Sequence, residues 1–109
     1  MQINPLASTL DTIHDLFPPN LGYYLKYTKR AGVVTIWFYA EYADNAVGYL
    51  NLGLTLPAGY RIGAKAYFPA YDDLHSRMVN VAIGTDGSFK PYGYNSGTSH
   101  IMGCISYAV

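Results

Sequence analysis

The densest cluster of polar side chains in this chain of 109 residues lies in residues 71–77. It combines adjacent carboxylates, an imidazole and a guanidinium with an aromatic ring. Saccharide recognition uses this mixture, because charged groups bond hydroxyls in pairs and a ring covers an apolar sugar face. The same residue types also form ordinary surface turns, although binding residues do favour loops on rigid sheets, so both interpretations stay open. The cluster consists of Tyr71, Asp72, Asp73, Leu74, His75, Ser76 and Arg77.

The carboxylates do not form a recognisable catalytic pair. Glycoside hydrolysis uses two carboxyl groups, about 5 to 9 Å apart, that flank one bond. Asp72 and Asp73 are adjacent, so in an extended chain they point to opposite sides, while Asp44 and Asp86 occupy turn-forming positions. We therefore predict a protein that is not an enzyme. Hydrolysis would require carboxylates from two subunits to meet at a boundary.

The histidines and the cysteine do not indicate a metal or cofactor site. His14, His75 and His100 match no zinc-ligand spacing. The acid-poor turns do not offer the roughly six or more oxygens that hold calcium. Cys104 follows Gly103 in a predicted strand, where a small buried thiol is the ordinary interpretation, and as a single cysteine it forms no disulfide within the chain. We predict no metal and no cofactor.

The composition excludes several partners. The formal charge is zero, which leaves no basic face for nucleic acid or for an anionic membrane. The start of the chain lacks the basic and apolar regions of a signal peptide, and no apolar run approaches the roughly 20 residues of a membrane span. We expect no nucleic-acid partner, no membrane insertion and no secretion signal.

From residue 21 onward, short runs of alternating apolar and polar residues are separated by turn signals. About seven or eight short strands at regular spacing predict an all-β fold, an antiparallel jelly-roll-like sandwich or barrel, in one domain over residues 21–109. The expected strands are residues 21–28, 33–42, 50–56, 64–69, 78–84, 88–94 and 99–108.

One short helix is expected before the sheet, at about residues 9–16. Ser8 suits its N-cap, Asp11 suits its positive end, and a double proline stops it. Four apolar residues in 4-3-4 spacing share one stripe, as in a coiled-coil seam. The stripe either docks on its own domain or packs against other subunits, so residues 1–20 are interpreted as a stem or linker. The stripe residues are Leu6, Leu10, Ile13 and Phe17.

The twelve tyrosines and the single tryptophan divide by strand parity. In residues 33–42 the better core face carries Val34, Ile36, Phe38 and Ala40. Several aromatic rings on the opposite side of one sheet exceed the apolar patch that a monomer usually exposes, which predicts an interface, a ligand site or both. The alternative is a sandwich with two apolar layers. Tyr23, Tyr27 and Tyr107 are predicted core residues, and the outward set is Tyr24, Trp37, Tyr39, Tyr49 and Tyr67.

Four segments share turn motifs that describe how a β head turns its corners. They are the Lys-Arg-Ala-Gly-Val-Val-Thr hairpin at residues 29–35, the Leu-Pro-Ala-Gly-Tyr-Arg run at residues 56–61, the Asp-Gly turn within residues 83–89, and the Gly-Cys-Ile-Ser-Tyr run at residues 103–107. From about Tyr24 to the end, the chain resembles the C-terminal head domains of bacteriophage tail fibres and baseplate receptor-binding proteins.

The resemblance implies a homotrimeric head at the phage tail tip, which contacts other tail or baseplate proteins and binds a host cell-surface saccharide without chemistry. In lactococcal phage members the saccharide site lies at or near subunit boundaries and uses aromatic, acidic, histidine and arginine side chains. Full-length members carry a shoulder and a neck before the head, whereas about twenty residues precede the first predicted strand here. A monomeric carbohydrate-binding module or lectin and a structural virion protein without a glycan ligand remain alternatives. The residues of the required types are Trp37, Tyr39, Asp72, Asp73, His75 and Arg77.

Overall fold

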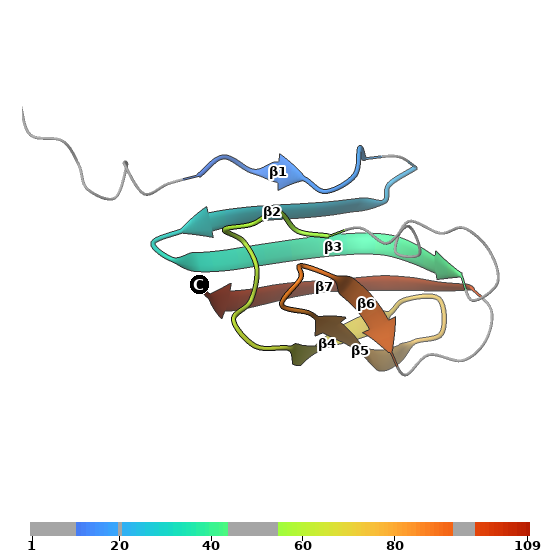
Figure 1. The fold of residues 1–109 in the computed structure, drawn as a ribbon. Coiled ribbons are helices and arrows are strands. Elements are labelled where there is room, and N and C mark those ends of the chain that lie inside the picture. The colour runs from blue at the N-terminus through green and yellow to red at the C-terminus, as the bar shows by residue number, and fades with distance from the viewer. Residues whose placement is uncertain (1–10, 20, 44–54, 93–97) are drawn as a thin grey trace, which may run out of the picture.

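The computed structural model describes residues 11–19, 21–43, 55–92 and 98–109 (Figure 1). These residues form a single seven-stranded antiparallel sheet of order β1-β2-β3-β7-β4-β5-β6, which curls into a half-barrel. The predicted all-β antiparallel class is confirmed. No helix in the described ranges is long and apolar enough to cross a membrane. The strands are β1 (His14–Asp15), β2 (Tyr24–Arg30), β3 (Val33–Ala43), β4 (Ala66–Asp72), β5 (Arg77–Ile83), β6 (Phe89–Tyr92) and β7 (Thr98–Ala108).

Six of the predicted strands correspond to β2 through β7, with ends that differ by a few residues. The remaining predicted strand, residues 50–56, lies mostly outside the described residues. Its last part is visible: Thr55 forms an isolated antiparallel bridge with Ser88, and the backbone N–H of Leu56 donates to the carbonyl of Gly87 over 2.9 Å. The described strands therefore make one curled sheet, and a second packed sheet is not seen among them.

The predicted helix at residues 9–16 is wrong for the part that the structure describes, because β1 occupies His14–Asp15 and pairs with β2. Tertiary contacts hold this segment extended. The carboxylate of Asp11 accepts a hydrogen bond from the Tyr60 hydroxyl, and Phe17 is buried in the core. A helix of about two turns is marginal in water, so these contacts outweigh its weak local preference.

The predicted hairpin between β2 and β3 is confirmed. Arg30 pairs with Val33 across a two-residue loop, in which Ala31 has φ of 50° and Gly32 has φ of 76°. A two-residue loop with positive φ at both positions matches the right-handed twist of antiparallel strands. The C-terminal Val109 closes on the same turn, since its N–H donates to the Gly32 carbonyl over 2.8 Å.

One face of the sheet, the inner face, forms the hydrophobic core. The predicted core positions of β3 are buried, and so are Tyr27 and Tyr107, whereas Tyr23 is half-buried. The segment that follows residue 55 crosses β3 and β7 in the view of Figure 1, and its Leu56, Tyr60 and Ile62 pack against the core. The apolar core side chains include Leu25, Val34, Ile36, Phe38, Ala40, Val79, Val81, Ile83, Phe89, Ile101 and Ile105.

Candidate functional site

The opposite side of the sheet, the outer face, carries a row of five large apolar or aromatic side chains, one from each of five neighbouring strands. Tyr24 of β2 lies opposite Tyr39 of β3, and Tyr39 lies opposite Met102 of β7. Tyr71 of β4 then lies opposite both Met102 and Met78 of β5. Because neighbouring strands are about 4.8 Å apart, this outer-face row spans about 19 Å.

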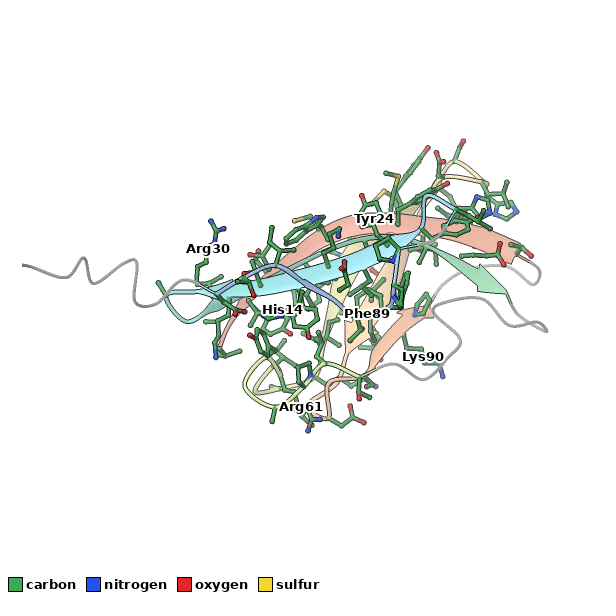
Figure 2. The ribbon with its side chains drawn as sticks, turned by 90° about the horizontal axis from the view of Figure 1, so that it is seen from above. His14, Tyr24, Arg30, Arg61, Phe89 and Lys90 are labelled. Carbon is green, nitrogen blue, oxygen red and sulfur yellow. The ribbon has the colours of Figure 1, made fainter. Side chains whose placement is uncertain are left out.

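The outer-face row is accessible from solvent. Met78 is 64% exposed, Met102 38% and Tyr71 37%, while Tyr24 and Tyr39 are half-buried. Figure 2 shows the side chain of Arg30 on the opposite side of the β2 ribbon from His14, and Tyr24 shares the outer face with Arg30 because both occupy even positions of the strand. A run of uncharged large side chains on one face is the kind of patch that marks a binding surface.

Polar groups border one side of this row. Glu41 of β3 lies opposite His100 of β7, and the backbone N–H of Asp73 donates to the His100 carbonyl over 2.8 Å. The Oε2 atom of Glu41 is 3.9 Å from Nε2 of His100. Glu41, His100 and Asp73, called the rim here, therefore lie together beside the row, with the Glu41 carboxylate next to the His100 imidazole.

His100 connects the rim to the row. The Tyr23 hydroxyl lies 3.3 Å from Nε2 of His100, and the Tyr39 hydroxyl lies 3.5 Å from Nδ1. Both tyrosine rings meet the imidazole edge to face, at centroid distances of 5.6 and 6.1 Å. The two tyrosine rings are 5.5 Å apart. Both nitrogens of His100 thus face a phenol, and the three rings form one contact group.

The structure brings some of the predicted saccharide-binding residues to this surface. Tyr39 belongs to the row and Asp73 to the rim, and both were predicted. Trp37 occupies the next outward position on β3, opposite Cys104 of β7, and is half-buried. The predicted outward orientation of Tyr24 and of Tyr67, which is 58% exposed, agrees with the structure, and Tyr49 lies outside the described residues.

The other predicted saccharide-binding residues form a separate group in the β4–β5 turn. Asp72 is completely buried and accepts hydrogen bonds from His75 Nδ1 over 2.7 Å and from Arg77 Nε over 3.1 Å. The backbone N–H groups of Leu74 and His75 also donate to it. Burial pushes the pKa of Asp72 upward, but the interactions with His75, Ser99 and Arg77 outweigh it and hold the pKa below the ordinary value. Asp72 therefore organises the turn from within and does not reach the outer face.

A second titratable cluster ties the N-terminal segment to the residues after the 57–59 turn. Nε2 of His14 is 2.8 Å from the Asp11 carboxylate, which also accepts the Tyr60 hydroxyl. The hydrogen bond to Asp11 raises the pKa of Tyr60 to about 12, and in this bond the phenol is the donor. This cluster has the chemistry of a structural tie.

The predicted stem residues separate in the structure. Ile13 is 53% exposed, whereas Phe17 is 4% exposed and belongs to the core of its own chain. Leu6 and Leu10 lie outside the described residues. The described half of the stripe thus does not share one face, because the segment forms the short strand β1 followed by a bend at residues 16–17 rather than a helix.

Residue patterns alone missed most of the row and the rim. His100, Met102 and Cys104 alternate with buried or packed residues along β7, and this alternation was a signal for their common face. The predicted burial of the Cys104 thiol is wrong, since this side chain is exposed. It has the parity of Met102, and the small neighbour on the inner side is Gly103, which faces the Phe38 ring.

Within the described residues, no group of three histidine, cysteine, aspartate or glutamate side chains is placed to hold a metal ion. A comparison with models of known protein families and with curated proteins gives no match. The chemistry of the outer face therefore carries the functional argument.

Proposed function

We propose that this chain is a non-enzymatic receptor-binding head domain of a bacteriophage tail fibre or baseplate protein, and that it binds a bacterial cell-surface saccharide as a homotrimer. In this proposal the domain acts at the virion tail tip, next to other tail or baseplate proteins, and completes a jelly-roll-like head. The observation that carries the proposal is the outer-face row with its rim.

The row and rim have the composition that saccharide binding requires. Tyrosine rings offer apolar faces for sugar rings, and their hydroxyls remain available at the edges. The Glu41 and Asp73 carboxylates accept pairs of hydroxyl hydrogens, and Glu41 is 33% exposed at its side chain. A row of about 19 Å has room for several sugar units in sequence, which suits a polysaccharide better than a monosaccharide.

Binding to a panel of purified bacterial cell-wall and capsular polysaccharides tests the proposal. Tyr71→Ala and Tyr39→Ala each remove a ring from the row, and we expect the affinity for a retained polysaccharide to fall at least about tenfold, as for central aromatic residues of other interfaces. Tyr67→Ala is the matched control, because Tyr67 is exposed on the same strand as Tyr71 but outside the row. Unchanged affinity in both row variants contradicts the proposed site.

Sedimentation equilibrium tests the trimer. Ile13 is the exposed apolar residue of the predicted stem stripe in the described range, and we propose that it contributes to subunit contacts together with Leu6 and Leu10. A trimer at micromolar concentration is the expected result. A stable monomer that still retains a polysaccharide would favour the monomeric carbohydrate-binding module or lectin.

The two methionines of the row favour a second candidate function. Methionine is enriched at protein interfaces and adapts to irregular partner surfaces, and Met78 is the most exposed member of the row. In this candidate the chain is a structural virion protein whose row is covered by another subunit. Met78→Gln would then weaken the oligomer, and the wild-type protein itself would retain no polysaccharide of the panel.

A further inference from the structure

His100 occupies a position from which its protonation state controls two phenol groups of the proposed site. Its Nε2 faces the Tyr23 hydroxyl at 3.3 Å, and its Nδ1 faces the Tyr39 hydroxyl at 3.5 Å. A neutral imidazole has one N–H donor and one acceptor nitrogen, whereas a protonated imidazole has two donors and no acceptor. The two hydroxyls therefore cannot keep the same hydrogen-bond roles in both states.

The number of N–H donors on His100 sets the roles of the two hydroxyls. Beside a neutral ring, one hydroxyl donates its hydrogen to the acceptor nitrogen and the other accepts from the N–H. Beside a protonated ring, both hydroxyl oxygens accept, so both hydroxyl hydrogens turn away from His100. We propose that His100 is a proton-operated selector beside the outer-face site: in acid it accepts a hydrogen bond from neither phenol, and at higher pH it accepts one.

The charges around His100 agree with a ring that takes up a proton. Among the described residues that pack around it, the titratable groups are Tyr23 ahead of β2, Tyr39 and Glu41 on β3, and Asp73 after β4. The Glu41 carboxylate, 3.9 Å from Nε2, balances the charge of the protonated ring. Histidine is the side chain that ordinarily changes charge between about pH 5 and 8.

The inference rests on the proposed saccharide function for its ligand class. A protonated imidazole beside the row favours a saccharide that carries carboxylate or phosphate groups, whereas the Glu41 carboxylate beside a neutral imidazole disfavours it at higher pH. We therefore expect anionic polysaccharides to bind more tightly at pH 5.5 than at pH 7.5, and neutral polysaccharides to respond less.

The selector itself is tested without any ligand. In protein labelled with ¹⁵N-histidine and ¹³C-tyrosine, the Cζ resonances of Tyr23 and Tyr39 should shift with the same midpoint as the ring nitrogens of His100. His100→Gln should abolish this shift. His75→Gln is the matched control, because His75 bonds Asp72 in a separate turn, and it should leave the two tyrosine titrations unchanged.

A second variant keeps the selector testable if His100→Gln misfolds. Tyr39→Phe removes the hydroxyl that faces Nδ1, and we expect it to move the titration midpoint of His100 while Tyr23 still responds. Tyrosine resonances that stay constant through the His100 titration would overturn the selector. So would tyrosine titrations that persist unchanged in His100→Gln.

The polysaccharide panel, run at pH 5.5 and 7.5, separates failure of the selector from failure of the proposed function. For the wild-type protein, we expect affinity for a retained anionic polysaccharide to rise at least about fivefold in acid, and His100→Gln should lose this gain. A panel without retained members overturns the proposed saccharide function, and the resonance titration still decides on the selector. Retention of an anionic polysaccharide that does not depend on pH overturns the link between the His100 selector and saccharide binding.

Discussion

The hydroxyl of Tyr60 donates a hydrogen bond to the carboxylate of Asp11, two residues separated by 49 positions in the sequence. The same carboxylate is bonded by His14, whose ring stacks on Tyr27 at a centroid distance of 5.2 Å. A single carboxylate thereby joins the N-terminal segment to the chain that follows the 57–59 turn. Its loss should loosen β1 from the edge of the sheet.

The first prediction concerns the pH dependence of this tie. Hydrogen bonds from Tyr60 and then His14 lower the pKa of Asp11 below its ordinary value of 3.8. A carboxyl whose pKa is lower in the folded than in the unfolded state stabilises the fold above the unfolded pKa, and this contribution disappears as the pH falls toward the folded pKa. We expect the free energy of unfolding of the wild-type protein to decrease below about pH 5.

Urea unfolding between pH 7 and pH 3 measures this contribution. Asp11→Asn should be less stable than the wild-type protein at pH 7, and the difference should shrink as the pH falls. Asp15→Asn is the matched control, since Asp15 bonds Lys26 on the exposed edge, where an ion pair contributes little. A constant difference between wild type and Asp11→Asn over the whole pH range would contradict the assignment.

The second prediction concerns the buried carboxylate of Asp72. In the wild-type protein, His75 Nδ1 and Arg77 Nε both bond the Asp72 Oδ2 atom. In Asp72→Asn an amide nitrogen replaces one carboxylate oxygen, so a donor faces these two donors. Leaving such groups without an acceptor costs about 2 kcal/mol. Asp72→Asn should therefore lower the free energy of unfolding by about that amount. Asp73→Asn, at the exposed neighbour, should stay within about 0.5 kcal/mol of wild type.

The pair Asp72 and Asp73 also shows where prediction from sequence ends. Adjacent residues of an extended chain point to opposite sides, and the structure confirms this, with Asp72 buried and Asp73 exposed. Which of the two is buried depends on the pairing of β4 with β7, where Asp72 lies opposite Ile101. That pairing joins distant parts of the chain, and local residue patterns do not report it.

The same limit explains why the candidate site was not predicted in full from the sequence. The alternation of Val34 and Ile36 with Trp37 and Tyr39 was sufficient to predict the two faces of β3, because period two is a local property. The row required a further fact, namely that β7 lies between β3 and β4, which places Met102 next to Tyr39. The strand faces were thus predictable, whereas the neighbours across strands were not.

The helix prediction failed for a related reason. Asp11 was interpreted as a favourable charge near a helix end, a local role worth up to about 1 kcal/mol. In the structure its partners are His14 and the distant Tyr60. Propensity is a weak signal that tertiary contacts override, and a segment of so few turns offers little resistance.

The third prediction concerns packing between β7 and the core. A Cβ atom added to Gly103 would lie 3.1 Å from Cζ of Phe38, and this ring is itself fixed edge to face against Phe89 at 4.8 Å. Because the Phe38 ring is 1% exposed, it has little room to yield. Gly103→Ala should lower the free energy of unfolding by about 1 to 2 kcal/mol.

Gly63→Ala is the matched control for this change. No atom lies within 4 Å of a Cβ built on Gly63, so steric conflict is absent there. Its free energy of unfolding should stay within about 0.5 kcal/mol of wild type in the same urea titration. If Gly103→Ala is equally neutral, the Phe38 ring is not held as closely as the structure indicates.

The fourth prediction uses the exposed thiol of Cys104 as a reporter of the outer face. Cys104 lies opposite Trp37 and two positions along β7 from Met102, so a partner on the row would shield it. In dilute native protein we expect a disulfide reagent such as dithiobis(nitrobenzoate) to react with Cys104 at a rate of the same order as in urea-unfolded protein, because exposure governs access to a thiol.

A reaction rate that falls as protein concentration rises would identify the outer face as a subunit interface. A rate that is independent of protein concentration but falls when a retained polysaccharide is added would identify it as the saccharide site. A native thiol that stays unreactive at nanomolar protein concentration, without polysaccharide, would contradict the exposure of Cys104 itself.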